Sequence, residues 1–242
     1  MEWKDGKYLK AYREFHVLVT DVDGTLTSPQ NRLHLPAVEA IRKLEEQGIH
    51  VVFCSGNILC SLLTLGFYLG TSGPVVAENG GVIMKLGWDN PLILGSKEMP
   101  LKAFNMLRET FGERIKEAGD QFYRFTDVAI RRTIDRETIV NTLNEAGIKV
   151  NVLDSGYAIH LCDVNVHKAI GVRKAVETLG YKSEEALGIG DGQNDIELLQ
   201  EVGYGIALNN APQILKDVAD YVTEKSYGEG FVEAVEKIFK IK

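Results

Sequence analysis

The sequence predicts an α/β protein, in which a doubly wound parallel sheet carries helices on both faces and holds a smaller inserted α+β domain. Three observations lead to this prediction. Short apolar runs alternate with amphipathic stretches at the start of the chain, and the same alternation resumes near its end. The apolar runs are continuous rather than alternating, which is typical of parallel strands covered on both faces. Between the two parts lies a region of different rhythm that begins among glycines and prolines.

The first part of the chain predicts strand, helix, strand, helix. In the first helix, Pro36 suits the first turn and Gly48 suits the end. Four residues with helical spacing form its apolar face: Ala37, Ala40, Ile41 and Leu44. The expected elements are strand 16–20, helix 36–47, strand 49–54 and helix 57–69.

The chain changes character after Met84, where glycine and proline recur up to Pro100 and indicate a domain boundary. The next region predicts an α+β module with a hairpin turn at Ser155-Gly156. Its expected elements are helices 101–111 and 137–146 and strands 128–132, 149–153 and 157–161.

The βα alternation resumes after this module. The expected elements are helix 166–179, strand 186–190, helix 194–201, strand 205–208 and helices 212–218 and 230–239. Repeated βα units imply right-handed crossovers and a Rossmann-like sheet. We therefore expect a core domain made of residues 1–84 and 164–242, with the α+β domain at 85–163 inserted into it.

Composition narrows the class of protein. The 242 residues carry a net charge of −7, with a pI near 5.4, so a nucleic-acid-binding surface is not expected. No stretch has the length of a membrane span, and Met1 to Phe15 lacks the apolar segment of a signal peptide, so we expect a cytoplasmic protein. Cys54, Cys60 and Cys162 have no metal-type spacing and are expected to be buried free thiols.

Polar residues follow three of the predicted parallel strands. Asp21 and Asp23 come directly after the first strand, Ser55-Gly56-Asn57 follows the second, and Asp191 to Asp195 follows strand 186–190. The carboxyl ends of parallel strands share one edge of the sheet, where ligands bind. Asp21 and Asp23 point the same way in an extended chain. An Asx turn is the alternative for the first segment alone, but the three strand ends together favour a site.

These segments resemble, in order, the motifs of the haloacid dehalogenase superfamily, and the resemblance covers nearly the whole chain. Asp21 to Thr25 is similar to motif one, Ser55 to motif two, Lys168 to motif three and Gly190 to Asp195 to motif four. The insertion between motifs two and three resembles the type-two (C2) α/β cap. Ser55 to Asn57 and the segment 77–81 are similar to the archaeal phosphoglycolate phosphatase and sucrose-phosphate phosphatase branch.

The resemblance implies a role for each acidic residue. Asp21 would be the nucleophile that forms an aspartyl-phosphate, and Asp23 would be the general acid and base. Mg²⁺ would be held by Asp21, the backbone carbonyl of Asp23, Asp191 and Asp195, the last directly or through water.

The resemblance also implies a set of phosphate-binding residues. Ser55, Gly56, Asn57 and Asn194 would bind the substrate phosphate, while Lys168 would neutralise it and keep Asp21 ionised. Two of them have a structural alternative: Ser55 as a helix N-cap and Lys168 as a solvated helix residue. Lys168 is followed by Ala169, where the family frequently has glycine.

The resulting hypothesis is a Mg²⁺-dependent phosphatase that acts on a small phosphorylated metabolite, with 2-phosphoglycolate the leading candidate. A sugar-phosphate phosphatase or a phosphomutase is the alternative. A non-catalytic phosphometabolite-binding protein is disfavoured, because binding alone does not need both Asp21 and Asp23. The inserted domain would set specificity, with Arg124, Arg131 and Arg132 as candidates for binding a substrate carboxylate. The sequence leaves a homodimer open.

Overall fold

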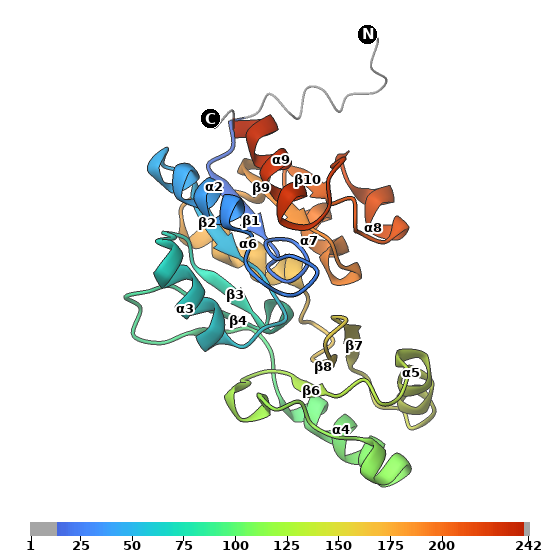
Figure 1. Cartoon of the computed structure of the whole chain (residues 1–242). Helices are drawn as coiled ribbons and strands as arrows, with labels where there is room; N and C mark the ends of the chain where they lie inside the picture. The colour runs from blue at the N-terminus through green and yellow to red at the C-terminus, as the bar shows by residue number, and fades with distance from the viewer. Residues whose placement is uncertain (1–13, 240–242) are drawn as a thin grey trace.

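The computed structural model describes residues 14–239, so most of the Met1 to Phe15 segment lies outside the described residues. The core is a five-stranded parallel sheet in the order β11-β10-β9-β1-β2 (Figure 1). Its strands are β1 (Val17–Thr20), β2 (His50–Phe53), β9 (Ala186–Gly190), β10 (Tyr204–Ala207) and β11 (Tyr221–Val222). The predicted doubly wound α/β core is confirmed.

The site expected from the sequence lies at the switch point of this sheet. From β1 the chain passes to β2 on one side and returns later to β9 on the other. Both neighbours pair in parallel with β1, so that Thr20 stands opposite Phe53 and Ile189. A crevice opens beyond the carboxyl ends of strands where the winding direction changes. The fold thus places the ends of β1, β2 and β9 around one crevice.

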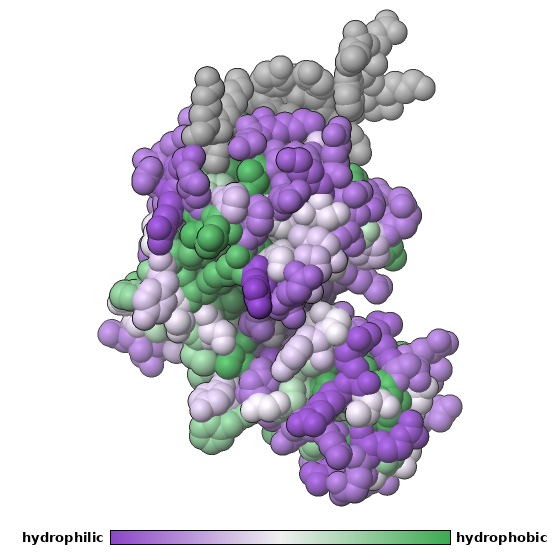
Figure 2. Space-filling view, viewed as in Figure 1, coloured by the Kyte–Doolittle hydropathy of each residue, from purple (hydrophilic) through white to green (hydrophobic). Residues whose placement is uncertain are grey.

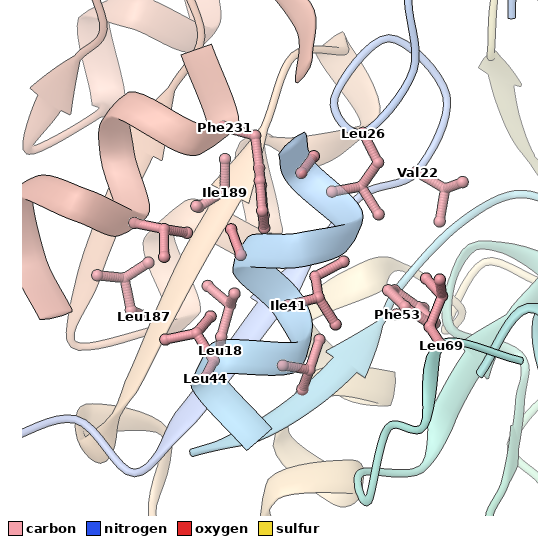
Figure 3. Packing of buried hydrophobic residues seen from close by; sticks show 14 of the residues in the cluster. Leu18, Val22, Leu26, Ile41, Leu44, Phe53, Leu69, Leu187, Ile189 and Phe231 are labelled. Carbon is pink, nitrogen blue, oxygen red and sulfur yellow. The ribbon is translucent and has the colours of Figure 1, made fainter. Parts of the chain in front are cut away.

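Helices cover both faces of the sheet. The core helices are α2 (Leu35–Glu46), α3 (Leu59–Leu69), α6 (Lys168–Thr178), α7 (Ile196–Glu201), α8 (Gln213–Val218) and α9 (Tyr227–Phe239). On one face, α2 and α9 pack on the sheet through Ile41, Leu44 and Phe231, together with Leu18 and Phe53 (Figure 3). On the other face, the buried residues come from α6, α7 and α8. Continuous apolar strands are explained by this two-sided cover.

Two helix starts differ from the prediction in an informative way. Helix α3 begins at Leu59 rather than Asn57, because Ile58 is extended (φ −67°, ψ 152°). Helix α6 begins at Lys168 rather than Val166, because His167 is extended (φ −155°, ψ 162°). In both places the polar motif precedes or starts the helix.

A short antiparallel sheet adjoins the core and was not predicted. It consists of β3 (Val75–Ala77), β4 (Val82–Met84) and β5 (Leu92–Ile93). A single 3₁₀ turn, η1 (Glu78–Gly80), joins the first two strands. A parallel bridge between Cys54 and Val76 connects this sheet to the end of β2. The turn is therefore brought next to the Ser55 segment.

We call residues 98–162 the cap. Helices α4 (Glu98–Phe111) and α5 (Arg136–Glu145) pack on an antiparallel sheet, ordered β6-β8-β7, around a separate apolar core. The strands are β6 (Val128–Ile130), β7 (Asn151–Asp154) and β8 (Ile159–Cys162). The visible face of the cap is mainly hydrophilic, and a waist separates it from the core (Figure 2). The cap is an α+β unit, as expected.

Four more short 3₁₀ helices lie in connecting segments of the described residues: η2 (Gly112–Arg114), η3 (Gln121–Tyr123), η4 (Ser183–Glu185) and η5 (Gln193–Asp195). One cysteine expectation is wrong: Cys54 and Cys162 are buried, but Cys60 is exposed. Cys60 follows the buried Leu59 on α3, and the next helical position points to solvent. Within residues 14–239 no helix is long and apolar enough to cross a membrane.

The packing of α9 on α2 gives a stability prediction. Phe231 is fully buried, so Phe231→Ala should lower the free energy of unfolding by about 3–5 kcal/mol, because it removes the ring and leaves a cavity. Leu35→Ala is the control, since Leu35 is 77% exposed and its loss should change stability by about 0.5 kcal/mol or less. Urea unfolding measures both. Equal effects would contradict the packing described.

Candidate active site

The first acidic residue lies at the end of the central strand. Asp21 directly follows β1 and is 7% exposed, and its N–H donates to the Ile189 carbonyl (2.9 Å). Asp23 is exposed to the cleft. Gly24 directly follows Asp23 and has φ +82°. A Cβ at this position would lie 2.2 Å from an Asp191 carboxylate oxygen. Only glycine permits this turn and the close approach of Asp191.

Lys168 joins the ends of two strands through ion pairs. Its ammonium, fully buried at the start of α6, lies 2.6 Å from Asp21 Oδ1 and 2.5 Å from Asp195 Oδ1. These residues are separated by 147 and 27 positions in the sequence. The solvated helix lysine that exposure statistics favour is therefore not what the fold contains. Lys168 is a buried cation between two carboxylates.

Burial and charge shift the pKa values of this cluster. Burial raises the pKa of Asp21 well above its usual value, Lys168 opposes the rise, and Asp195 and Asp191 add to it. Burial, followed by the charge of Asp195, raises the pKa of Asp191 to about 7. Burial alone would lower the pKa of Lys168, but Asp195 and Asp21 outweigh it and raise that pKa. The carboxylates are thus crowded beyond what one ammonium neutralises.

The crowded carboxylates fit a divalent metal ion. One carboxylate oxygen from each of Asp21, Asp191 and Asp195 lies within 4.8 Å of the others. When all three carboxylates are ionised, they exceed the charge of the one ammonium by two, which a divalent cation would balance. Oxygen-only ligands are those preferred by Mg²⁺ and Ca²⁺. The donor set is therefore suited to a hard divalent cation.

The two aspartates of the last motif are held differently. Asp195 is fully buried, and its Oδ2 accepts the N–H groups of Asp191 (3.0 Å) and Gly192 (2.8 Å) while its Oδ1 binds Lys168. Asp191 is only partly buried and accepts from Thr25 Oγ1 (2.7 Å) and Asn210 Nδ2 (2.9 Å). Asp191 is the more accessible of the two carboxylates.

Asn210 and Thr25 support the site but were missed by the sequence reasoning. Asn210 donates to the Gly24 carbonyl (3.1 Å) as well as to Asp191, and accepts from the Tyr227 N–H (2.7 Å). It lies 186 positions from Gly24. Such a contact leaves no local sequence pattern. Thr25 belongs to the first motif, but the sequence does not indicate that its hydroxyl donates to Asp191.

The Ser55 segment forms a compact turn before α3. Ser55 is buried, and its Oγ accepts the N–H of Asn57 (3.2 Å). The N-cap of α3 is Ile58, so the alternative role of Ser55 as that helix's cap is wrong. Asn57 Nδ2 donates to Asp23 Oδ2 (2.6 Å), which ties the second motif to the first. Gly56 and Asn57 both line the cleft next to Asp21.

The η1 turn connects the remaining polar residues. Asn79 is buried with φ +55°, and its Oδ1 accepts from Asn194 Nδ2 (3.2 Å). A Cβ on Gly80 would lie 2.2 Å from the His167 carbonyl, so the turn packs directly against the start of α6. Both Asn194 and the Ser55 segment line the cleft. The acidic and phosphate-binding residues expected from the sequence meet at this edge of the sheet. Of the three arginine candidates only Arg124 lines the cleft, and Arg132 instead pairs with Asp154 (3.0 Å).

Core and cap enclose a cleft of about 620 Å³. On the cap side it is lined by Asp120, Arg124, His160 and the 155–157 hairpin. His160 Nδ1 lies 2.7 Å from the buried Asp127 carboxylate, so this histidine is held in place within the cap. Cys54 lies beneath the cluster, and burial raises the pKa of its thiol to about 12, as expected for an unreactive core cysteine.

Comparison with known proteins identifies the family. The family model of haloacid dehalogenase-like hydrolases matches residues 18–145 and 95–235. The chain belongs to this family. It is 41% identical over 225 residues to a protein named phosphoglycolate phosphatase from Methanoculleus marisnigri, covering 92% of this chain and 96% of the relative. The expectation of a hydrolase of this superfamily is confirmed.

Solved structures share the complete fold of this haloacid dehalogenase-like hydrolase. A Thermoplasma acidophilum protein superposes with a TM-score of 0.84 at 28% identity, covering 95% of this chain and all of that one. A subclass IIB sugar phosphatase of the superfamily superposes with a TM-score of 0.77 at 19% identity, covering 93% and 99%. The arrangement of core and cap is therefore common to these proteins.

The contacts of Asn210 generate a prediction about metal affinity. Asn210→Ala removes the hydrogen bond that orients Asp191, so the dissociation constant for Mg²⁺ should rise about tenfold or more. Isothermal titration calorimetry measures it. The matched control is the exposed neighbour Asn209→Ala, which should leave the constant unchanged. An identical constant for both variants would contradict the orienting role of Asn210.

Proposed function

We propose that this hydrolase is a Mg²⁺-dependent phosphatase that hydrolyses 2-phosphoglycolate to glycolate and phosphate. The observation that carries the proposal is the buried Lys168 ammonium bound to Asp21, with Asp23 facing the same cleft two residues later. Lys168 occupies Oδ1 of Asp21, which leaves Oδ2 as the attacking atom. The names of the curated relatives support the choice of substrate.

In the first half of the reaction, Asp21 Oδ2 attacks phosphorus and the bond from phosphorus to the leaving oxygen breaks. Asp23 donates its proton to the leaving alkoxide of glycolate. The product of this step is an aspartyl-phosphate on Asp21. Asn57 holds Oδ2 of Asp23 at 2.6 Å and so fixes the direction of the carboxyl group.

In the second half, the ionised Asp23 accepts a proton from a water molecule that attacks the same phosphorus. The bond from phosphorus to Asp21 breaks, which releases inorganic phosphate and regenerates the Asp21 carboxylate. Donors from Ser55, Gly56 and Asn57 bind the phosphoryl oxygens throughout, and Lys168 offsets their charge. The cap covers the cleft and limits the access of bulk water.

Asp21, Asp191 and the backbone carbonyl of Asp23 would hold Mg²⁺. Asp195 would act through water, because it is fully buried and paired with the Lys168 ammonium, whereas Asp191 is only partly buried. When bound, Mg²⁺ offsets the excess negative charge of the carboxylates and the phosphoryl group.

A sugar phosphate is the second candidate substrate. The cleft of about 620 Å³ lies within the roughly 300–1,000 Å³ typical of sites for larger metabolites, so it has room for more than phosphoglycolate. A phosphomutase would use the same nucleophile and return the phosphoryl group to the substrate. The cytoplasmic location and the domain boundaries stay predictions, and a homodimer stays open.

Phosphate release from a panel of phosphomonoesters tests the proposal. With Mg²⁺, kcat/KM for phosphoglycolate should exceed that for each sugar phosphate by about tenfold or more, a discrimination typical of one or two matched polar contacts. Asp21→Asn should lower turnover by about 10⁴-fold or more, because it removes the nucleophile. Chelation of the metal should abolish turnover reversibly.

Asp217→Asn is the matched control, since Asp217 is exposed on α8 and bonds only to Gln213 among the described residues. A higher kcat/KM for a sugar phosphate than for phosphoglycolate would contradict the proposed substrate and favour the sugar phosphate. Exchange of labelled phosphate between isomers without net release would indicate a mutase. Turnover that survives Asp21→Asn would refute the mechanism itself.

A further inference from the structure

Each carbonyl of the Ser55-Gly56-Asn57 loop is held by a donor from another segment. The Asn79 N–H donates to the Ser55 carbonyl (3.1 Å), and the Glu78 N–H donates to the Asn57 carbonyl (3.1 Å). The middle carbonyl, that of Gly56, accepts from Arg124 Nη1 (3.1 Å). The first two donors belong to the η1 turn of the core, whereas Arg124 belongs to the cap.

The Gly56 carbonyl matters because of the geometry of its peptide group. A trans peptide is planar, so its C=O and the following N–H point in opposite directions. Holding the Gly56 oxygen therefore fixes the direction of the Asn57 N–H. This N–H donates to the Ser55 hydroxyl oxygen (3.2 Å), and the Asn57 side-chain amide donates to Asp23 (2.6 Å). Rotation of this one peptide would misplace a phosphate donor beside the reacting groups.

Arg124 is itself held rigidly. Its guanidinium is buried and pairs with Asp120 (2.6 Å) and with both oxygens of Asp127 (3.0 Å each). The buried Asp127 also pairs with His160, so the arginine is one part of a larger cap network. With these partners in place, the guanidinium is already neutralised by carboxylates of its own domain. Among the described residues, the guanidinium contacts the core through its hydrogen bond to the Gly56 carbonyl.

The segment that carries Arg124 is docked on the same turn that holds the loop. The Glu78 carboxylate accepts from the N–H groups of Phe125 (2.9 Å) and Thr126 (2.7 Å) and from the Thr126 hydroxyl (2.8 Å). Glu78 is fully buried and has φ +51°, a strained backbone conformation for a residue other than glycine. Cap position and loop geometry therefore depend on one another through Glu78 and Arg124.

We propose that Arg124 is a positioning residue that holds the Gly56 carbonyl when the cap is seated on the core. It thereby keeps the Ser55–Asn57 loop, with the Asn57 N–H beside the Ser55 hydroxyl, in the conformation that binds a phosphoryl oxygen. Phosphate binding is then coupled to cap position. This role deepens the proposed phosphatase function and rests on it. It differs from the carboxylate recognition expected from the sequence, because it acts on the phosphoryl group and not on the leaving group.

Inorganic phosphate separates these two roles, because it has no leaving group. In the presence of Mg²⁺, Arg124→Lys should raise the inhibition constant of inorganic phosphate about tenfold, so that phosphate binds more weakly. Lysine keeps the charge but cannot bridge two carboxylates and a carbonyl. KM for the ester should rise in parallel. Arg136→Lys is the matched control: Arg136 Nε donates to the Val152 carbonyl (2.8 Å) within the cap, and phosphate inhibition should stay unchanged.

Two outcomes would overturn the proposal. If KM for phosphoglycolate rises while phosphate inhibition is unchanged, Arg124 recognises the leaving group and not the phosphoryl group. Its Nε could make that contact, since it has no hydrogen-bond partner among the described residues. If neither changes, the contact with Gly56 has no role in binding. Failure of the proposed substrate gives a different result, because the wild type would then not hydrolyse phosphoglycolate. Phosphate inhibition would in that case be measured with an ester that the wild type does hydrolyse.

A measurement on the wild type covers the case in which Arg124→Lys does not fold. In a titration with inorganic phosphate and Mg²⁺, the backbone amide resonance of Asn57 and the guanidinium resonances of Arg124 should shift with the same midpoint. Guanidinium resonances that stay unmoved at saturating phosphate would overturn the proposal without any variant.

Discussion

The buried ammonium of Lys168 is the interaction on which the site depends. It connects α6 to the ends of β1 and β9 through Asp21 and Asp195, three segments that are distant in the sequence. A buried charge is tolerated only when it is paired, and removing one partner of such a pair costs about 3–5 kcal/mol. The ion pairs therefore hold the strand ends at a fixed separation. The same pairing opposes the rise in the pKa of Asp21 that burial causes, and so favours the ionised form that a nucleophilic carboxylate requires.

The surroundings of this cluster follow from the need to crowd acids at one edge of a sheet. Gly24 lets the chain turn so that Asp191 can approach, and Asn210 and Thr25 orient that carboxylate. The η1 turn then joins the Ser55 loop, the start of α6 and the cap. Strain at Glu78 and Asn79 is stored where these parts meet, as is common at functional sites. Charge, phosphate binding and cap position thus depend on one small region.

The sequence was sufficient for the core strands, the inserted α+β unit and the main site residues. Asp21, Ser55 and Asp191 could be placed together because each follows an apolar strand, and parallel strand ends share an edge. Asn210 could not be found, because its partner Gly24 is distant in sequence and its effect is a hydrogen bond. Glu78 was missed because a buried carboxylate in a turn has no local signal. Cys60 was misjudged, since cysteine type alone does not say which helix face it occupies.

The central claim is that Asp21 carries the phosphoryl group, and trapping that group tests it most directly. The enzyme would be quenched with acid during turnover, treated with borohydride and analysed by peptide mass spectrometry. Borohydride reduces an aspartyl-phosphate to homoserine, so the account predicts this conversion at Asp21 and at no other aspartate. Conversion at Asp23 or Asp191, or a quenched enzyme with unmodified Asp21 under conditions of rapid turnover, would contradict it.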